Sequence, residues 1–292
     1  MNVPAQLDGV THRTVHARGI DFHVAEAGTG DDVVLCLHGW PQHWYEWRHL
    51  LPALAGDHRV LALDLRGFGS TEASRDGYEK EEMASDVLAV LDALGLERVK
   101  LVGHDWGAWI GFLLCLRAPQ RFERYLALNI LPPWTSARAM LPQLWRFWYQ
   151  AVILSPGLGY ALHRSGKFVP KVLVGASTRK EVWDERTLRS FGDNLAEPAR
   201  ARAAVQMYRV FNLREAAAIM RGRYAKQRLT VPTLMLFGTD DKALRPELLA
   251  GYEDHAEDMR VEFVPDCGHF IADEMPELVA ERALGFFASS AN

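Results

Sequence analysis

Short, mostly apolar runs recur along the first half of the chain, and each run ends in a turn that contains glycine or polar residues. The runs lie at residues 33–37, 60–65, 99–102 and 125–130. A strand buried on both faces of a parallel sheet has this pattern. Between the runs, apolar residues fall at helical spacing, most clearly over 79–94, where Gly95 ends the helix. The pattern predicts strands that alternate with helices in a mostly parallel sheet.

The remainder of the pattern extends this alternation toward both ends of the chain. Residues 14–17 and 20–25 alternate apolar and polar positions around Arg18-Gly19, which predicts an antiparallel hairpin. The other predicted elements are helices at 44–54, 106–117, 246–253 and 277–287 and strands at 232–239 and 260–264. The predicted fold class is therefore α/β, with a mostly parallel eight-stranded sheet and helices on both faces.

The alternation stops between residues 133 and 225. Helical segments follow one another there without a convincing buried strand, and arginine and aromatic residues are frequent. About 90 residues without a strand are unexpected inside an alternating sheet fold, where connections are short. We therefore predict one α/β core formed by residues 1–132 and 226–292, with an inserted helical cap, or lid, formed by residues 133–225.

The composition is ordinary for a globular chain of 292 residues, with 49% hydrophobic and 24% charged residues. The net charge of −4 and the lack of a basic block give no reason to expect nucleic acid or an anionic membrane as a partner. Residues 1–14 lack the pattern of a signal peptide, and the longest apolar stretches are too short to span a bilayer. The odd count of cysteines favours free thiols, with Cys36 and Cys115 buried. We expect a cytoplasmic protein.

One of the apolar runs ends in Gly103-His104-Asp105-Trp106-Gly107, and a helix is predicted directly after it. Strand, sharp turn and helix in this order resemble the nucleophile elbow of the α/β-hydrolase fold, with Asp105 where serine is usual. The two glycines leave room around a strained turn residue. A carboxylate is ionised at neutral pH, so Asp105 can attack an sp3 carbon without a base and form an ester. The motif alone is equally compatible with a charged turn residue between two glycines.

A carboxylate nucleophile needs a base to hydrolyse its ester and an acid to orient that base. His269 follows the last predicted strand, and Asp240 and Asp241 follow the strand at 232–239. The carboxyl ends of parallel strands share one edge of the sheet, so these groups are expected to meet Asp105 there. Asp241 is the predicted orienting acid and Asp240 the reserve. The alternatives are a surface-loop histidine and carboxylates that cap a helix or brace a loop.

The chain order of nucleophile, acid and base is also the order found in α/β-hydrolases. The other histidines have no such strand-end context and are expected to be surface or loop side chains. They are His12, His16, His23, His58, His163 and His255.

Ester hydrolysis also needs N–H donors for an oxyanion. The backbone N–H of Trp106, directly after the nucleophile, is one expected donor. The second is expected from Trp40 in the loop His38-Gly39-Trp40-Pro41, which follows the strand at 33–37. A plain tight turn held by the histidine is the alternative for this loop. The residues expected to bind substrate are His38, Pro41, Trp109 and Trp148.

These motifs together resemble the epoxide hydrolase branch of the α/β-hydrolases. The resemblance covers residues 21–287 and rests on His38-Gly39-Trp40-Pro41, residues 64–70, 103–108 and 238–241, Gly268-His269-Phe270 and Glu274-Met275-Pro276. It implies two cap tyrosines that protonate the epoxide oxygen. They correspond to Tyr149, seven residues ahead of Pro156-Gly157, and Tyr208, which precedes Arg209. Residues 151–154 are aliphatic where the family often has further aromatic residues, so Tyr149 matches less closely. Packing is the alternative role for both tyrosines.

The resemblance implies an enzyme that works without a cofactor. Asp105 attacks an oxirane carbon while Tyr149 and Tyr208 protonate the oxygen, and water activated by His269 then releases a vicinal diol. No cluster of His, Cys or Asp in the sequence has metal-ligand spacing, so no metal is expected. The aromatic residues around the motifs suggest a small apolar, aryl-bearing epoxide as the substrate.

Two alternatives remain beside an epoxide hydrolase. Haloalkane and haloacid dehalogenases use the same Asp nucleophile. The haloalkane enzymes usually carry Asn at the position of Trp40, and fluoroacetate-type enzymes carry Arg at the position of Trp106. The tryptophan found at each position argues against a dehalogenase. A non-catalytic scaffold that binds an apolar ligand or partner would not need three triad residues. Exposed aromatic residues in the cap could also form the face of a homodimer.

Overall fold

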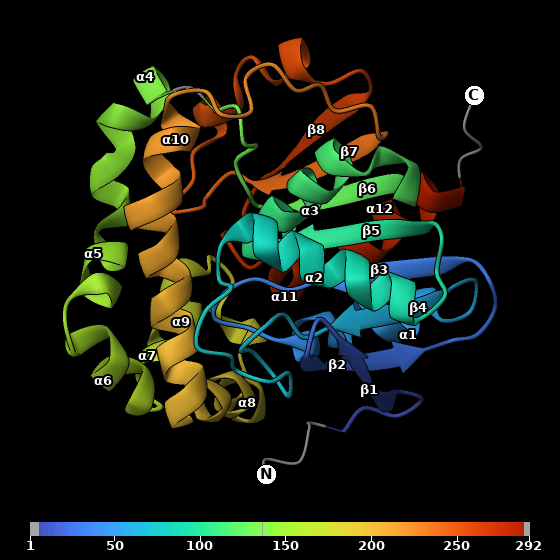
Figure 1. Cartoon of the computed structure of the whole chain (residues 1–292), viewed down its shortest axis with the longest axis horizontal. Coiled ribbons are helices and arrows are strands. Elements are labelled where there is room, and N and C mark those ends of the chain that lie inside the picture. Colours follow the sequence, from blue (N-terminus) through green and yellow to red (C-terminus); the bar gives the residue numbers. More distant parts are fainter. Residues whose placement is uncertain (1–5, 136, 289–292) are drawn as a thin grey trace.

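The computed structural model of the chain describes residues 6–135 and 137–288, and a sheet of eight strands forms its centre (Figure 1). The strands are β1 (Thr11–Ala17), β2 (Ile20–Ala27), β3 (Val33–Leu37), β4 (Arg59–Leu63), β5 (Val99–His104), β6 (Phe122–Leu128), β7 (Thr233–Gly238) and β8 (Met259–Val264). Their order across the sheet is β1-β2-β4-β3-β5-β6-β7-β8. β3 and β5 therefore occupy the middle of the sheet.

The pairing confirms the predicted mostly parallel sheet. β1 pairs antiparallel with β2, and β2 with β4, while every other neighbouring pair is parallel. The predicted hairpin turns at Arg18-Gly19, where both residues have positive φ, as a two-residue hairpin turn requires. β3 and β5 are buried at every position, as their mostly apolar sequences predicted.

Helices cover both faces of the sheet (Figure 1). α2 (Lys80–Ala93) and α3 (Trp106–Arg117) lie together on one face. α1 (Leu50–Leu54) contacts α12 (Pro276–Ala288), which the short helix α11 (Ile271–Glu274) precedes, on the other face. The 3-10 turns of this part are η1 (Trp44–Arg48), η2 (Pro119–Arg121), η6 (Pro246–Leu249) and η7 (Tyr252–His255).

Two helices predicted as continuous are divided in the structure. The segment 44–54 forms η1 and then α1, with the change at His49. Pro52 explains this division, because it has no N–H to bond the carbonyl of residue 48 in a continuous helix. The segment 246–253 forms η6 and part of η7, separated by Gly251 with φ 86°. A positive φ ends a helix, and glycine adopts it at little cost.

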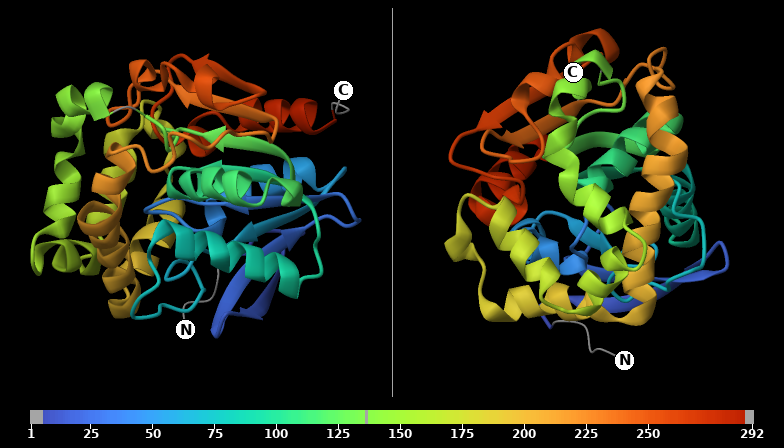
Figure 2. Two further views of the ribbon diagram at one scale, coloured as in Figure 1. Left: turned by 45° about the horizontal axis from the view of Figure 1, so that its top comes forward. Right: turned by 90° about the vertical axis from the view of Figure 1, so that its left-hand side faces the viewer.

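Between β6 and β7 the described residues form helices and turns without a strand, in agreement with the interrupted sequence pattern. We call this part the helical segment. Its elements are α4 (Ala137–Met140), η3 (Leu141–Phe147), α5 (Trp148–Leu154), α6 (Leu158–Arg164), α7 (Phe168–Ala176), η4 (Lys180–Val182), α8 (Glu185–Ala196), α9 (Pro198–Val210), the π-helical turn η5 (Phe211–Glu215) and α10 (Ala216–Met220). Both views of Figure 2 show these helices gathered on one side of the sheet.

The three cysteines, Cys36, Cys115 and Cys267, are buried free thiols, as predicted for the first two. Over residues 6–135 and 137–288, no helix has both the length and the apolar character needed to cross a membrane.

Candidate active site

Asp105 lies at the sharp turn between β5 and α3, where the sequence predicted it. Its φ of 46° and ψ of −122° belong to a region that residues other than glycine rarely adopt. A residue held there stores about 1–3 kcal/mol of strain, which the surrounding structure must offset. The turn presents the carboxylate to a cavity that Asp105 helps to line.

Three glycines let the backbone approach this turn. A Cβ on Gly103 would lie 2.7 Å from the backbone of α3, and one on Gly107 would lie 2.1 Å from a carbonyl oxygen of β3. A Cβ on Gly39 would lie 2.4 Å from the Cβ of Asp105. Only glycine fits at these three positions. The close packing at Gly103 and Gly107 agrees with the sequence prediction. The sequence analysis did not predict that Gly39 lets its loop approach Asp105.

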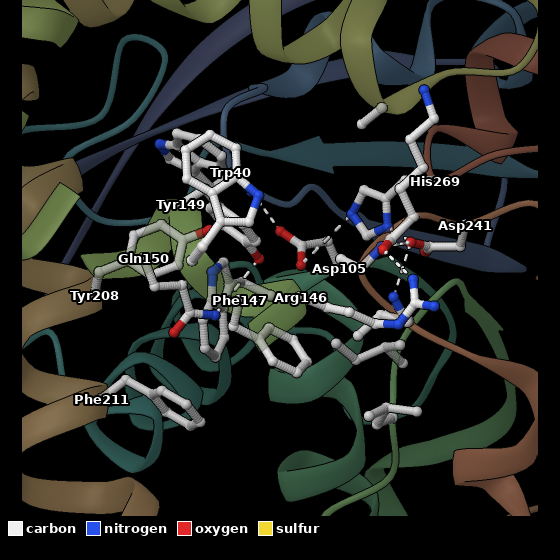
Figure 3. A pocket seen from close by; sticks show the side chains of 18 of the residues that line it. Trp40, Asp105, Arg146, Phe147, Tyr149, Gln150, Tyr208, Phe211, Asp241 and His269 are labelled. Atoms are coloured by element: carbon white, nitrogen blue, oxygen red, sulfur yellow. Dashed lines mark hydrogen bonds and ion pairs between the residues drawn. The ribbon is translucent and has the colours of Figure 1, made fainter. Parts of the chain in front are cut away.

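His269 and Asp241 meet Asp105 at the same edge of the sheet (Figure 3). The Nδ1 of His269 donates to Asp241 Oδ2 at 2.7 Å, and its Nε2 lies 3.8 Å from Asp105 Oδ1. Asp241 is fully buried, and its Oδ1 accepts two backbone N–H groups of the following loop at 2.8 and 2.9 Å. The neighbouring Asp240 is exposed. The structure therefore brings Asp241, and not Asp240, against the histidine.

The charges of this group shift its pKa values. Burial lowers the pKa of His269, but the charges of Asp241 and Asp105 outweigh burial and raise it above 6.5. Burial raises the pKa of Asp241, but the charge and N–H of His269 and further donors lower it below its ordinary value. One of these donors is Asn129, whose Nδ2 lies 3.1 Å from Asp241 Oδ2. Sequence reasoning missed Asn129, although a polar residue directly after a buried strand was a usable signal.

Both expected oxyanion donors lie beside Asp105. The backbone N–H of Trp40 donates to Asp105 Oδ2 at 2.9 Å. Trp106 is the first residue of α3, so its N–H has no partner within the helix. The indole N–H of Trp40 donates to His163 at 3.1 Å, and the other ring nitrogen of His163 donates to Gly159 O at 2.7 Å. His163, expected at the surface, is therefore a buried group that fixes the Trp40 side chain.

His38 and Pro41 are placed differently from the expectation. Neither His38 nor Pro41 is among the described residues that line the cavity. The Nε2 of His38 accepts the backbone N–H of Leu65 at 3.0 Å, and its Nδ1 donates to Gly39 O at 2.9 Å. His38 and Pro41 were expected to contact substrate, and this geometry corrects that expectation because neither residue reaches the cavity. His38 is held by backbone groups on both ring nitrogens and stabilises the loop that carries Trp40, which was the alternative reading of this loop.

Tyr149 on α5 and Tyr208 on α9 approach the nucleophile from the helical segment (Figure 3). Their ring centroids lie 6.2 Å apart with the planes at 86°. Trp40 stacks on Tyr149 at 6.3 Å and meets Tyr208 edge-on at 5.2 Å. Burial raises the pKa of both hydroxyls, and the charge of Asp105 raises them further. Both tyrosines therefore remain protonated at neutral pH and can donate.

A cavity of about 620 Å³ is lined both by the three residues at the sheet edge and by the two tyrosines of the helical segment. Apolar side chains from the core and the helical segment form most of its lining, including Trp109 and Phe211. Trp148 also lines the cavity, although this residue is 66% exposed. The lining thus includes both Trp109 and Trp148, as expected from the sequence.

A buried ion pair behind the site was not recognised in the sequence. His104 Nδ1 lies 2.6 Å from Glu46 Oε1, and its Nε2 donates to the carbonyl of His269 at 2.9 Å. Burial lowers the pKa of His104, but Glu46 raises it to about 9, so the histidine is charged. The other oxygen of Glu46 accepts the N–H of Gly39 at 3.3 Å. The pair thereby links the turn that carries Asp105, the loop of His269 and the loop of Gly39 and Trp40.

Two more histidines that were expected in surface loops are buried. His23 lies within β2, is buried and places Nδ1 2.7 Å from Asp64 Oδ2. His58 is also buried, with Nδ1 3.1 Å from Asp32. No local feature of the sequence distinguishes these two residues from exposed histidines.

Comparisons with known proteins agree with this geometry. The family model of the alpha/beta hydrolase fold matches residues 32–155, which include the oxyanion loop and the nucleophile turn. Sheet order, turn and match together define the chain as an α/β-hydrolase.

The more particular family follows from similarity over nearly the whole chain. The soluble epoxide hydrolase of Corynebacterium sp. (strain C12) is 31% identical over 286 residues, which cover 96% of this chain and 98% of that protein. Among solved structures, the epoxide hydrolase CorEH matches with a TM-score of 0.86 and 28% identity, and the epoxide hydrolase VrEH1 from Vigna radiata with 0.80 and 28%. Each match covers 96% of this chain and 99% of the other. The chain belongs to the epoxide hydrolase family and is a hydrolase.

Proposed function

We propose that this protein opens apolar epoxides to vicinal diols through an ester on Asp105. The observation that carries the proposal is the surroundings of this carboxylate. One oxygen is held by the Trp40 N–H, while the other lies near His269, and two tyrosines line the same cavity. This arrangement supplies a nucleophile, proton donors for the leaving oxygen, and a base for hydrolysis.

In the first step, Oδ1 of Asp105 attacks an oxirane carbon and the carbon–oxygen bond of the ring breaks. Oδ1 is the attacking oxygen because Oδ2 already accepts the Trp40 N–H. An alkoxide is too basic to leave unprotonated, so the ring oxygen takes a proton from Tyr149 or Tyr208. The product of this step is a hydroxyalkyl ester. Both tyrosines fit the acid role because each is protonated and lines the cavity beside Asp105.

In the second step, His269 takes a proton from water, and the water oxygen attacks the Cγ of the ester. The N–H groups of Trp40 and Trp106 stabilise the oxyanion. Asp241 holds the ring so that Nε2 faces Asp105. Collapse of the tetrahedral intermediate breaks the ester bond, the leaving oxygen takes the proton from His269, and the diol departs. The proton left on the regenerated Asp105 carboxyl passes through water to the tyrosinate formed in the first step, which restores the starting state. Each step uses side chains and backbone groups of this chain.

We also propose that the helical segment is a cap spanning residues 133–225, over a core of residues 1–132 and 226–292. Support comes from the cavity, whose lining combines core residues with residues of α5, α9 and η5. Its apolar lining favours an apolar, aryl-bearing epoxide. The indole N–H of Trp40 is occupied by His163, so it does not offer a donor for a halide. The Trp106 indole N–H has no hydrogen-bond partner among the described residues, so only one of the two indole donors beside Asp105 is withdrawn from a halide.

The test is intact-protein mass spectrometry of His269→Gln after incubation with styrene oxide, together with wild-type turnover. We expect the variant to gain the full mass of the epoxide, because ester formation does not need the base but hydrolysis does. Asp105→Ala in the same background should gain nothing, and the wild type should produce diol. A halide-releasing adduct with haloalkanes and no adduct with epoxides would assign the chain to dehalogenation. Tight binding without an adduct on either substrate would support a ligand-binding scaffold.

A further inference from the structure

Lys80 is a buried cation that the proposed reaction does not use. It is the first residue of α2, and its exposed fraction is 0%. Burial lowers the pKa of the ammonium to about 8, and Glu215, Glu79 and Asp105 are the charges that oppose this effect. A buried ammonium is costly unless other groups replace its water shell. Two of the groups around Lys80, the rings of Trp106 and Phe211, belong to the wall of the active-site cavity.

The ammonium lies over two aromatic rings of that wall. Nζ is 4.5 Å from the ring centroid of Trp106 and 5.5 Å from that of Phe211. The two rings contact each other at 4.7 Å in a T-shaped arrangement. Trp106 also meets Tyr208 at 5.6 Å, again edge to face. The cation thus fixes the indole that separates it from one of the two acid tyrosines.

The same side chain binds the helix that carries Tyr208. Nζ donates to the carbonyl of Met207 at 3.3 Å and to that of Tyr78 at 3.2 Å. Glu215 lies 3.7 Å from Nζ, and its other oxygen accepts the backbone N–H of Lys80 at 2.9 Å. Glu215 ends the π-helical turn that follows α9, so the pair joins the core helix α2 to both ends of this turn.

We propose that Lys80 is a positioning residue for the acid Tyr208, holding it through the Trp106 indole and the Met207 carbonyl. The inference rests on the proposed function, because it assumes that Tyr208 protonates the epoxide oxygen. The Trp106 indole packs edge to face against the Tyr208 ring, with the centroids 5.6 Å apart, and this contact positions the hydroxyl. An indole that moves would weaken this interaction and displace the hydroxyl. Only ester formation uses this acid, so only that step should depend on Lys80.

The experiment measures ester formation and ester hydrolysis separately. In the His269→Gln background, the rate of mass gain with styrene oxide reports ester formation alone. We expect Lys80→Met, which keeps most of the length of the side chain and removes the charge, to slow ester formation about 10-fold. This is less than the roughly 10²–10⁴-fold typical of a general acid, because Tyr208 itself remains present. Lys80→Arg, which keeps the charge, should recover most of the rate. With His269 present, single-turnover quenching should give the same hydrolysis rate for Lys80→Met as for wild type.

Lys100 provides the matched control. It is also buried, and it pairs with Asp32 and Glu123 away from the cavity. Lys100→Met should lower thermal stability without changing the ester-formation rate. If Lys80→Met forms the ester at the control rate, or slows both steps equally, the proposal is overturned.

Two further variants complete the test. Should Lys80→Met not fold, Glu215→Gln takes its place, since it removes the charge that keeps the lysine protonated. It should slow ester formation at least threefold, and an unchanged rate would reject the proposal. Tyr208→Phe in the same background distinguishes the two failures. If Tyr208→Phe slows ester formation and the Lys80 variants do not, only this inference fails. If Tyr208→Phe changes nothing, the acid assignment itself fails.

Discussion

The two sides of the active site are held in different ways. On the sheet side, Asp241 accepts hydrogen bonds from His269, Asn129 and two backbone N–H groups, and Trp40 binds Asp105 through its backbone. On the helical side, aromatic contacts hold Tyr149 and Tyr208, and the Tyr149 hydroxyl accepts a long hydrogen bond of 3.5 Å from Gln150.

This difference follows from what each side must do. A base must face one carboxylate carbon at a fixed angle, and strand ends braced by backbone N–H groups provide that fixed geometry. Proton donors must meet an oxygen whose position changes with the substrate. Aromatic packing is less directional than hydrogen bonding, so it tolerates small shifts of the tyrosines. The comparison predicts that substitutions on the sheet side cost more activity than substitutions on the helical side.

The largest loss is expected from Asp105→Ala. Without the nucleophile no ester forms, and diol production should fall about 10⁴-fold or more. Product analysis by chromatography measures this loss. Asp240→Ala is the matched control, because Asp240 is an exposed carboxylate adjacent in sequence to the orienting acid, and it should retain activity within about twofold of the wild type. Equal losses in the two variants would contradict the assignment.

Asp241→Asn should rank second, with a loss of about 10²–10⁴-fold in ester hydrolysis. It also changes the pH dependence. His269 must be neutral to accept a proton, and its pKa is raised, so hydrolysis in the wild type should fall as the pH drops through that raised pKa. Removing the Asp241 charge lowers the pKa, so the acid limb should move to lower pH. A pH profile of single-turnover hydrolysis that keeps its acid limb in place would refute this role.

Tyr149→Phe and Tyr208→Phe should each slow ester formation by about 10–100-fold, because one proton donor remains. The rate of mass gain in the His269→Gln background provides the measurement. The double variant should lose more than either single one. If only Tyr208→Phe has an effect, Tyr149 is a packing residue. The sequence analysis left this alternative open because Tyr149 matches the family less closely.

The smallest effects on activity are expected from substitutions outside the active site, which change the stability of the fold. Leu101 in β5 is fully buried, so Leu101→Ala should lower the free energy of unfolding by about 2–5 kcal/mol. Leu141 in the helical segment is 58% exposed, so Leu141→Ala should change it by less than about 0.5 kcal/mol. Denaturant unfolding compares the two. Comparable losses would mean that Leu141 is covered in solution, for instance by a second copy of the chain.

Several parts of the site could be predicted because local sequence determines them. Gly103 and Gly107 flank a carboxylate that lies at a sharp turn between a strand and a helix. His269 and Asp241 also follow strands, so the parallel sheet brings them to Asp105 without further information. The pattern of apolar residues predicts one helix over 44–54, whereas the missing N–H of Pro52 divides it.

Other residues could not be assigned from the sequence because their partners lie far away along the chain. Glu46 and His104 are 58 positions apart in the numbering, and nothing local distinguishes a buried charged pair from two exposed residues. His163 and Trp40 belong to different parts of the fold, so their hydrogen bond exists only once the helices lie against the oxyanion loop. His38 was predicted to bind substrate for the same reason, because its actual partner is the backbone N–H of Leu65, which belongs to another segment of the chain.

The sequence by itself determined the alternation of strands and helices, the strained turn and the chain order of the triad, because these depend on short-range patterns. Tertiary structure alone decided which carboxylate orients His269, how the tyrosines reach the nucleophile, and where Lys80 and Glu215 place their charges. The physical reason is that burial, charge pairing and aromatic contact arise between segments, and their energies depend on distances that the order of residues does not contain.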